Sequence, residues 1–429
     1  MRSYDSEFKS VLSKVRAHEK WFAQSLPMIA SENVASKPVR DVLSSDLGHR
    51  YAEGWPGERV YAGCRFIDQI ELQAIDLGKK LFKAEFIDVR PISGVVANLA
   101  VYSAFSQPGD TMTALSIPNG GHISHGKRDF SGSAGLVHSL EIEYYVFDKD
   151  EMNIDVDATK KKLDGIKSLK IAMFGASLFL FPHPVKELAD AVKGNGGVVC
   201  YDAAHVVGLV AGGMFQDPLR EGAQVMTFST HKTLFGPQGG AVVSSGVFAD
   251  QLKKAVFPGT TSNHHLHSVA GKALAFAEYL QFGRKYARDV VRNAQALAQE
   301  LAALGENVLG EKNGYTKSHQ VAVDVTKYSD GGVIEKLLES QNIIANRQLI
   351  PGDLKAGRHF TNPGGIRLGV AELTRLGMGR GEMREVAEVL HLALTGEKKR
   401  EVVARTKELR RDFQSVRYSF RDSPAYSFR

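Results

Sequence analysis

Short apolar runs alternate with stretches of helical spacing through the middle of the chain. Four of these runs are rich in β-branched or aromatic residues, and they span residues 171–174, 198–201, 225–228 and 241–243. Strands that alternate with helices are typical of a mostly parallel sheet covered by helices. We therefore predict an α/β fold for this part of the chain.

Helical spacing also marks the start of the chain. The apolar positions that recur there at helical spacing are Phe8, Val11, Leu12, Val15 and Trp21. They predict an amphipathic N-terminal arm. A longer helical pattern over residues 265–305 predicts a bridge between two domains.

Short strands and two helical stretches follow the predicted bridge. The strands are expected at residues 320–325, 343–344 and 365–370. This mixture indicates a second, smaller α+β domain. The predicted units are a helical arm over 1–45, a large domain over 46–275, and a small domain with a basic tail over 276–429.

Composition narrows the class of protein. The chain has 429 residues, with 43% apolar and 24% charged residues, which suits two domains of an ordinary globular protein. No apolar run approaches the roughly 18 residues that a membrane helix requires. Two cysteines are too few for a disulfide framework, and the polar start lacks a signal-peptide segment. We expect a cytoplasmic protein.

The positive charge is concentrated at the C-terminal end. Residues 397–429 hold ten Lys/Arg and five Asp/Glu, a balance of +5 out of the net +6. A basic tail could bind nucleic acid. The tail also holds five aromatic residues, which are Phe413, Tyr418, Phe420, Tyr426 and Phe428. These favour packing against the body of the protein, so nucleic-acid binding is the less favoured interpretation.

Two charged residues close neighbouring apolar runs. Asp202 ends the run over 198–201, and Lys232 follows the run over 225–228. A pyridoxal phosphate (PLP) site needs this pair: the amine forms a Schiff base with the aldehyde, and the carboxylate keeps the pyridine nitrogen protonated. His205 could then bond the phenolic oxygen of the ring. A metal site at Asp202 and His205 would leave Lys232 unexplained.

Two further segments could contact the same cofactor. Ser93 and Gly94 lie at a predicted strand-to-helix junction, where helix N–H groups could hold a phosphate; a plain helix cap is the alternative. His122 and His125 lie in a glycine-rich loop over 120–126. A ring stacked on the pyridine is favoured there over a metal site.

Substrate chemistry is suggested by an arginine and by a loop. Arg367 lies inside an apolar strand, where a buried guanidinium normally has an anion partner. An amino-acid carboxylate is a natural partner, and an internal salt bridge is the alternative. The segments 51–57 and 61–64 are rich in glycine and aromatic residues around Glu53, which favours a binding loop over a turn packed on itself.

Together these segments resemble serine hydroxymethyltransferase, a PLP-dependent enzyme of fold type I, the aspartate aminotransferase-like fold. The resemblance covers about residues 31–375. Its most specific blocks are residues 29–33, 49–54, 120–122, 201–205, 229–233 and 365–369. It implies interconversion of serine and glycine, with transfer of a one-carbon unit to a reduced pterin as co-substrate. It also implies a homodimer with shared active sites.

The resemblance also implies the roles of individual residues. The catalytic residues would be Lys232, Glu53, His122, Tyr61 and Thr230. The cofactor would contact Asp202, His205, Ser93, Gly94, Ser177, His231 and Lys232, and no metal is expected. The substrate would contact Ser31, Tyr51, Glu53 and Arg367. Tyr51, Glu53 and Tyr61 would come from the partner subunit.

Several positions depart from the usual pattern of the family. They are Val95 in the phosphate turn, Phe235 and Gln238 after the lysine, and the segment over 260–265. Asn263, His264 or His265 could replace the usual phosphate contacts across the dimer. These departures resemble the archaeal branch, in which tetrahydromethanopterin-type carriers can replace tetrahydrofolate. The alternative functions are a pterin-independent β-hydroxyamino-acid aldolase and, less favoured, an RNA-binding protein.

Overall fold

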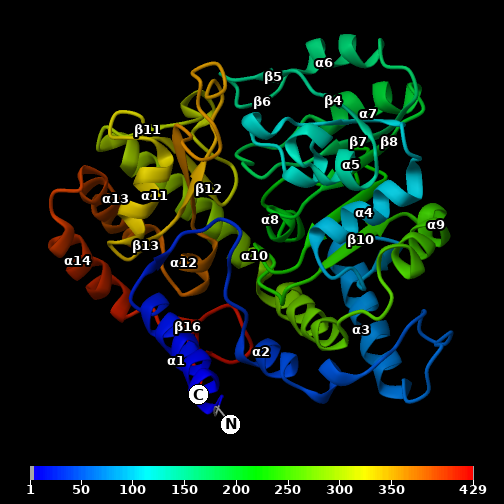
Figure 1. The fold of residues 1–429 in the computed structure, drawn as a ribbon, viewed down its shortest axis with the longest axis horizontal. Helices are drawn as coiled ribbons and strands as arrows, with labels where there is room; N and C mark the ends of the chain where they lie inside the picture. Colours follow the sequence, from blue (N-terminus) through cyan, green and yellow to red (C-terminus); the bar gives the residue numbers. More distant parts are fainter. Residues whose placement is uncertain (1–3, 429) are drawn as a thin grey trace.

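A seven-stranded sheet forms the centre of the larger part of the molecule (Figure 1). The structure is a computed structural model that describes residues 4–428. The strand order is β2 (Phe86–Asp88), β10 (Gly240–Ser244), β9 (Val225–Ser229), β8 (Val198–Asp202), β7 (Leu169–Phe174), β3 (Thr111–Ala114) and β4 (Glu141–Tyr144). Only β10 runs antiparallel to its neighbours. The prediction of a mostly parallel sheet is confirmed.

Alternating residues of the central strands build hydrophobic cores on opposite faces of the sheet. Phe174 and Tyr201 belong to one core, whereas their chain neighbours Met173 and Cys200 belong to another. A sheet that is covered on both faces explains why its strands are continuous apolar runs. The covering helices are α3 (Arg65–Phe82), α4 (Gly94–Phe105), α5 (Ser133–Val137), α6 (Val156–Leu163), α7 (Val185–Gly194), α8 (Val207–Ala211) and α9 (Ala249–Lys254).

A four-stranded antiparallel sheet forms the centre of the smaller part of the molecule, and the buried Val, Ile and Leu side chains of its strands belong to the same core as Phe174 and Tyr201. Its order is β11 (Asn307–Val308), β12 (Gln320–Asp324), β15 (Gly365–Gly369) and β14 (Asn346–Gln348). The helices α11 (Gly331–Glu339), α12 (Ala371–Arg375) and α13 (Arg380–Thr395) accompany it. The predicted strands at 320–325, 343–344 and 365–370 all correspond to strands of the structure.

One long helix connects the two sheets. Helix α10 (Leu266–Ala303) has 38 residues and packs against α3 as well as α13. It corresponds to the bridge predicted over 265–305. The predicted domain limit at residue 275 falls inside this helix, most of whose buried apolar side chains lie in a core shared by the two sheets.

The two ends of the chain lie beside each other (Figure 1). The arm is α1 (Asp5–Phe22), which has no buried side chain, followed by β1 (Leu26–Pro27) and α2 (Lys37–Leu43). Strand β1 pairs with β13 (Ile343–Ile344) of the small domain. The C-terminal end forms α14 (Lys399–Arg411), β16 (Ser415–Val416) and β17 (Ser423–Pro424). Across the described residues, 4–428, no helix is long and apolar enough to cross a membrane.

A buried lysine joins α10 to the large sheet. The Lys272 amine donates to the carbonyls of Val89 (2.6 Å), Gly240 (2.9 Å) and Pro91 (3.1 Å). Its side chain is fully buried, and burial lowers its pKa to about 7. These bonds fix the segment that leads into α4.

Lys272→Met is expected to destabilise the fold, because three carbonyls lose the lysine as a donor. The Pro91 carbonyl keeps a bond from the Gly240 N–H (2.9 Å), and each buried carbonyl left unsatisfied costs about 1–3 kcal/mol. The measurement is the thermal melting temperature, with Lys407→Met on the exposed side of α14 as the matched control. Equal melting temperatures for the two variants would contradict this role of Lys272.

Candidate active site

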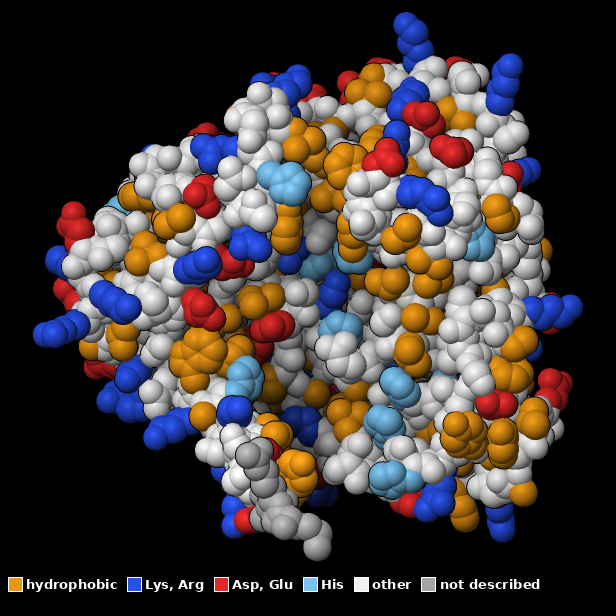
Figure 2. Space-filling model, in the orientation of Figure 1, with side chains coloured by type: hydrophobic (Ala, Val, Ile, Leu, Met, Phe, Trp, Pro, Cys, Tyr) orange, Lys and Arg blue, Asp and Glu red, His pale blue; other side chains and the backbone are white. Residues whose placement is uncertain are grey.

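Asp202 and Lys232 lie at the same edge of the large sheet. Asp202 is the last residue of β8, and Lys232 follows β9 by three residues. Because β8 and β9 are parallel neighbours, their carboxyl ends meet at one edge, which is where open α/β sheets bind ligands. Both side chains are buried, with 6% and 7% exposed. Figure 2 shows a hollow between the two parts of the molecule in which histidine and basic side chains gather.

Three donors converge on the Asp202 carboxylate. Asn98 Nδ2 (2.8 Å) and His125 Nε2 (3.0 Å) contact one oxygen, and the Ala204 N–H (2.9 Å) donates to the other. Burial alone would raise the pKa of Asp202, but His125 and the other partners hold it below its ordinary value. Asp202 is therefore ionised at neutral pH, as a partner for a protonated pyridine nitrogen must be.

The surroundings of the Lys232 amine favour its neutral form, whereas those of Asp202 favour its charged form. Burial lowers the pKa of Lys232 to about 8, although the Asp202 charge raises it in part. Its backbone carbonyl accepts bonds from Asn33 Nδ2 (2.9 Å) and from the Phe235 N–H (3.1 Å). A fixed lysine with a substantial neutral fraction is what attack on an aldehyde requires.

Several imidazoles around this pair are neutral. Burial lowers the pKa of His122 to about 3, and burial with the nearby Lys232 charge lowers that of His205 well below its ordinary value. His205 Nδ1 contacts Gln320 Nε2 (3.0 Å), and its ring stacks on His319 at 5.8 Å. A neutral ring can stack on a pyridine without adding charge.

A metal site is the competing interpretation for part of this cluster. His122, His125 and Asp202 each offer one ligand atom, and these atoms lie within 4.8 Å of one another. However, the Asp202 carboxylate already accepts three hydrogen bonds. A metal ion there would leave Lys232 without a role, so the cofactor interpretation accounts for more of the cluster.

Arg367 lies in β15 of the small domain and is directed to the same site. Its Nη1 donates to the Ser177 carbonyl (2.7 Å) and hydroxyl (3.1 Å), and Nε and Nη2 donate to Asn346 Oδ1 (3.3 and 3.2 Å). None of these acceptors is charged. Burial lowers the pKa of Arg367 to about 10, which still leaves it cationic. The alternative of an internal salt bridge is therefore wrong for this residue, and an anionic ligand is the better fit.

The N-terminus of α4 has the close contacts of a phosphate cradle. Ser93 caps the helix by accepting from the Val96 N–H (3.2 Å). A Cβ on Gly94 would lie 2.5 Å from Ser229 Oγ, and one on Gly240 would lie 2.3 Å from the Ser93 carbonyl. These glycines let the backbone approach β9 and β10 without a side chain, which leaves the helix N–H groups open to an anion.

His231 and Thr230 follow β9 beside this cradle, and they differ in whether their side chains already have a hydrogen-bond partner. His231 Nδ1 is buried and has no hydrogen-bond partner among residues 4–428, which suits a contact to an added group such as a phosphate. The Thr230 hydroxyl donates to the Pro237 carbonyl (2.6 Å), so it stabilises the turn after Lys232. The amine, the carboxylate and the cradle at one sheet edge together fit PLP.

The segment over 29–34 borders the site. The Ala30 carbonyl contacts His319 Nε2 (2.9 Å), and Asn33 binds the Lys232 carbonyl. Ser31 lies between these two anchors and is half-buried. Its predicted contact with a substrate carboxylate stays a prediction.

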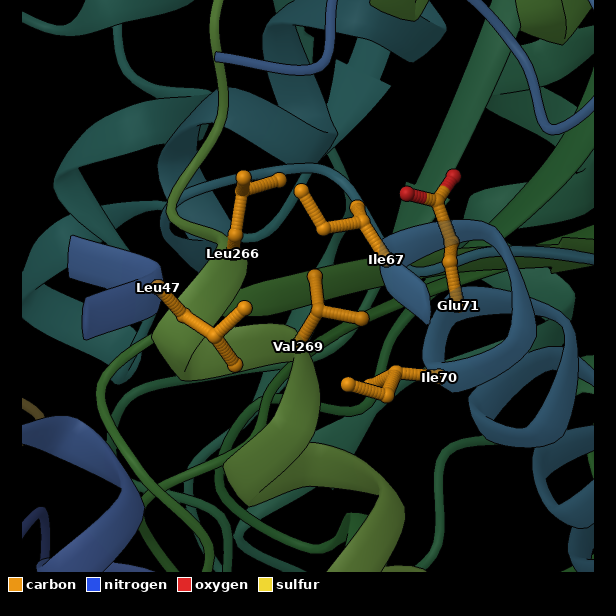
Figure 3. A pocket seen from close by; sticks show the side chains of 6 residues that line it. All are labelled: Leu47, Ile67, Ile70, Glu71, Leu266 and Val269. Atoms are coloured by element: carbon orange, nitrogen blue, oxygen red, sulfur yellow. The ribbon is translucent and has the colours of Figure 1, made fainter. Parts of the chain in front are cut away.

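Within residues 4–428, no hydrogen bond, ion pair or ring contact joins Lys232 to the loop that holds Tyr51, Glu53 and Tyr61. The two tyrosine rings lie 5.3 Å apart and are half-exposed, and the Glu53 carboxylate accepts from Ser262 Oγ (2.6 Å). Arg59 connects the loop to helix α3. It donates to the carbonyls of Ala52 and Gly54 in the loop and pairs with Asp68 and Glu71 of α3. A small apolar pocket lies near this loop. Figure 3 shows four of the side chains that line it directed toward one another: Leu47, Ile67, Leu266 and Val269.

The segment expected to supply phosphate contacts across a dimer is engaged within the chain. Asn263 binds the Ala52 N–H (3.0 Å) and the Arg50 carbonyl (3.1 Å), and His264 binds buried Glu71 (2.9 Å). Of the three residues proposed for that contact, only His265 is exposed. Within the described chain Asn263 and His264 stabilise the Glu53 loop, and the contact across a dimer stays a prediction.

Comparison with known proteins identifies the family. The family model described as serine hydroxymethyltransferase matches residues 1–390. The chain belongs to the serine hydroxymethyltransferase family. It is 63% identical to the serine hydroxymethyltransferase of Cenarchaeum symbiosum, over 97% of this chain and 96% of that protein. It is 58% identical to that of Nitrosopumilus maritimus (96% and 95%) and 53% identical to that of Methanopyrus kandleri (96% and 95%).

Serine hydroxymethyltransferases are PLP-dependent enzymes of fold type I that use a folate-type one-carbon carrier. The predicted family, fold class and reaction class, a transfer of one-carbon groups, are therefore confirmed. The sequence missed Asn98, His125, His319 and Gln320, which hold Asp202 and His205. His125 has a visible signal, since it lies three residues from His122, but the spacing does not indicate that its ring holds Asp202.

The rate at which the PLP-free protein takes up PLP is expected to increase about tenfold per pH unit and to level off near pH 8, because only the neutral Lys232 amine attacks the aldehyde. The measurement is the rise of the bound-cofactor absorption after mixing, from pH 6 to pH 10. Nα-acetyl-lysine, with an ordinary pKa, should keep accelerating up to pH 10. The same continued increase in the protein would contradict the tuning of Lys232.

Proposed function

We propose that this chain interconverts serine and glycine with PLP held on Lys232, and passes the one-carbon unit to a reduced pterin of the tetrahydrofolate or tetrahydromethanopterin type. The observation that carries the proposal is the buried pair of Asp202 and Lys232, with Arg367 directed to the same site. Similarity to archaeal relatives supports considering the tetrahydromethanopterin type beside tetrahydrofolate.

Each residue has a distinct task in the proposed reaction. Bound PLP supplies an electron sink that accepts the electron pair of a bond broken at the substrate Cα. Asp202 would keep a proton on the pyridine nitrogen, and the neutral His122 ring would lie against the cofactor ring. Ser93, Gly94 and His231 would hold the phosphate, while Ser177 and His205 would contact the phenolic oxygen. Lys232 would hold the cofactor through its amine.

Arg367 and Ser31 bind the carboxylate of the substrate. The Arg367 guanidinium has only neutral partners within the described chain, so a carboxylate would provide the missing counter-charge through two parallel hydrogen bonds. Ser31 adds a hydroxyl from the segment that Asn33 fixes on the Lys232 carbonyl. This arrangement would orient Cα over the ring.

Glu53 is proposed to move the proton at the hydroxyl of serine, and Tyr51 and Tyr61 to line the same region. We propose that a partner subunit delivers all three, so that the working unit is a homodimer with shared active sites. The half-exposed tyrosines and the inward anchoring of their loop by Arg59 support this arrangement. Because Arg59 fixes the backbone of the loop while its tyrosine side chains stay exposed, the loop is suited to contact a neighbouring chain.

The alternative is a β-hydroxyamino-acid aldolase on the same scaffold, which would use every PLP contact but no pterin. The two functions differ in the exchange of the α-proton of glycine with solvent. With the transferase, a reduced pterin should accelerate this exchange. NMR in D2O with each carrier in turn measures it, and the carrier that accelerates exchange identifies the co-substrate. An exchange rate that neither carrier changes would contradict the transferase.

Glu53→Gln should bind serine but lose about 10²- to 10⁴-fold in pterin-dependent turnover, because a proton-transfer group is removed. Glu58→Gln in the same loop is the matched control and should keep wild-type turnover. Mixing Glu53→Gln with Lys232→Ala should restore activity if the sites are shared, because a mixed dimer has one site with both native residues. Full turnover by Glu53→Gln alone would remove Glu53 from this role.

A further inference from the structure

The C-terminal strap, residues 413–428, crosses the molecule from α14 to three other helices. Figure 1 shows this segment in red beside α1 and α2. The Tyr418 hydroxyl donates to Asp289 of α10 (2.9 Å), and the Tyr426 hydroxyl donates to buried Glu372 of α12 (2.6 Å). Arg40 of α2 donates to the carbonyls of Pro424 (2.6 Å) and Ala425 (2.7 Å). The basic tail is thus a docked element, as its aromatic residues predicted.

Tyr418 adopts a backbone conformation that its surroundings must maintain. Its φ is +55°, a left-handed conformation that costs a bulky residue on the order of 1–3 kcal/mol. Three contacts hold it there: the bond to Asp289, the ring contact with Tyr286 at 5.2 Å, and the bond from Arg375 Nη1 to the Tyr418 carbonyl (2.6 Å). Such strain persists where neighbouring groups over-determine the conformation.

The first path from Tyr418 toward the active site passes through Arg375. The Arg375 guanidinium is fully buried and lies 3.7 Å from the centre of the Phe235 ring. Phe235 is also left-handed, with φ +49°, and its N–H donates to the Lys232 carbonyl (3.1 Å). Together with the buried Glu278 carboxylate, which pairs with Arg375 Nη2 (3.1 Å), the Tyr418 carbonyl therefore positions the cation that packs on the turn after Lys232.

The second path passes through Tyr286. Its ring contacts Phe235 (5.1 Å) as well as Tyr418, and its hydroxyl accepts from Asn33 Nδ2 (2.8 Å). The same Asn33 amide group donates to the Lys232 carbonyl (2.9 Å). Both paths therefore end on one carbonyl group, that of Lys232.

The strap also supports the segment that borders the substrate. Val416 and Ala425 of the strap pack with Val34 and Leu376 in a small buried cluster. The Val34 carbonyl accepts from Arg375 Nε (3.4 Å). The backbone around Asn33 is therefore held from the side of the strap as well as from Lys232.

We propose that Tyr418 is a positioning residue of the active site: from the C-terminal strap it holds, through Arg375 and Tyr286, the turn that carries Lys232. The proposal rests on the proposed role of Lys232. Tyr418 acts on the site through other residues: Arg375 and Tyr286 connect it to the turn after Lys232 and to Asn33.

Tyr418→Ala removes the ring and the hydroxyl, and with them two of the three contacts that hold the carbonyl toward Arg375. A turn displaced by a fraction of an ångström should lower kcat by about 10- to 100-fold. The KM for serine should stay within about twofold, because the partners of Arg367 are untouched. The affinity of the PLP-free protein for PLP, measured by absorption titration, should fall by about tenfold.

Tyr418→Phe keeps the ring and is expected to restore kcat and PLP affinity to near wild type. Phe420→Ala is the matched control in the same strap, since Phe420 is 63% exposed and contacts only Phe282 among rings. If Tyr418→Ala does not fold, Tyr418→Asn, which tolerates the left-handed conformation, has the same expected losses.

The outcomes separate this proposal from the proposed function. A folded Tyr418→Ala or Tyr418→Asn with wild-type kcat and PLP affinity would overturn the role of Tyr418 while leaving the transferase intact. Equal losses in Tyr418→Phe and Tyr418→Ala would also overturn it, because the ring would not matter. A wild-type protein that binds PLP at another lysine would overturn both proposals.

Discussion

The burial of opposite charges at one edge of the large sheet constrains the rest of the site. A carboxylate and an amine removed from water are costly unless each has partners. Asp202 has His125, Asn98 and a backbone N–H, and these keep it ionised despite burial. Burial lowers the pKa of the Lys232 amine to about 8, although the Asp202 charge raises it in part. The same surroundings thus leave a fixed anion beside an amine that is ready to react.

The remaining elements hold this edge in place from several directions. Lys272 of α10 fixes the backbone before the cradle at α4 through three carbonyls. The small domain contributes Arg367 and Gln320, so the site is completed only where the two sheets meet. The strap reaches the Lys232 carbonyl through Arg375 and Tyr286. Activity should therefore depend on residues far from the chemistry.

The sequence predicted those features that leave a local signal. Asp202, Lys232 and Arg367 stand at the ends or in the middle of apolar runs, where a charge is conspicuous, and the central strands follow from the same runs. The supporting partners leave no such signal. Asn98 is 104 residues from Asp202, and Gln320 is 115 residues from His205, so only the folded chain brings them together. That Asn263, His264 or His265 contacts a phosphate across a dimer stays a prediction; the bonds of Asn263 to Ala52 and of His264 to Glu71 join residues that are far apart in the sequence and leave no local signal either.

The most direct test concerns which lysine holds PLP. Two buried lysines with lowered pKa values border the cradle, Lys232 (about 8) and Lys272 (about 7), so burial alone does not distinguish them. Borohydride reduction of the PLP-loaded protein followed by peptide mass spectrometry identifies the lysine that is linked to the cofactor. The account predicts the label on Lys232, because only Lys232 follows the strand beside Asp202. A label on Lys272 would contradict it.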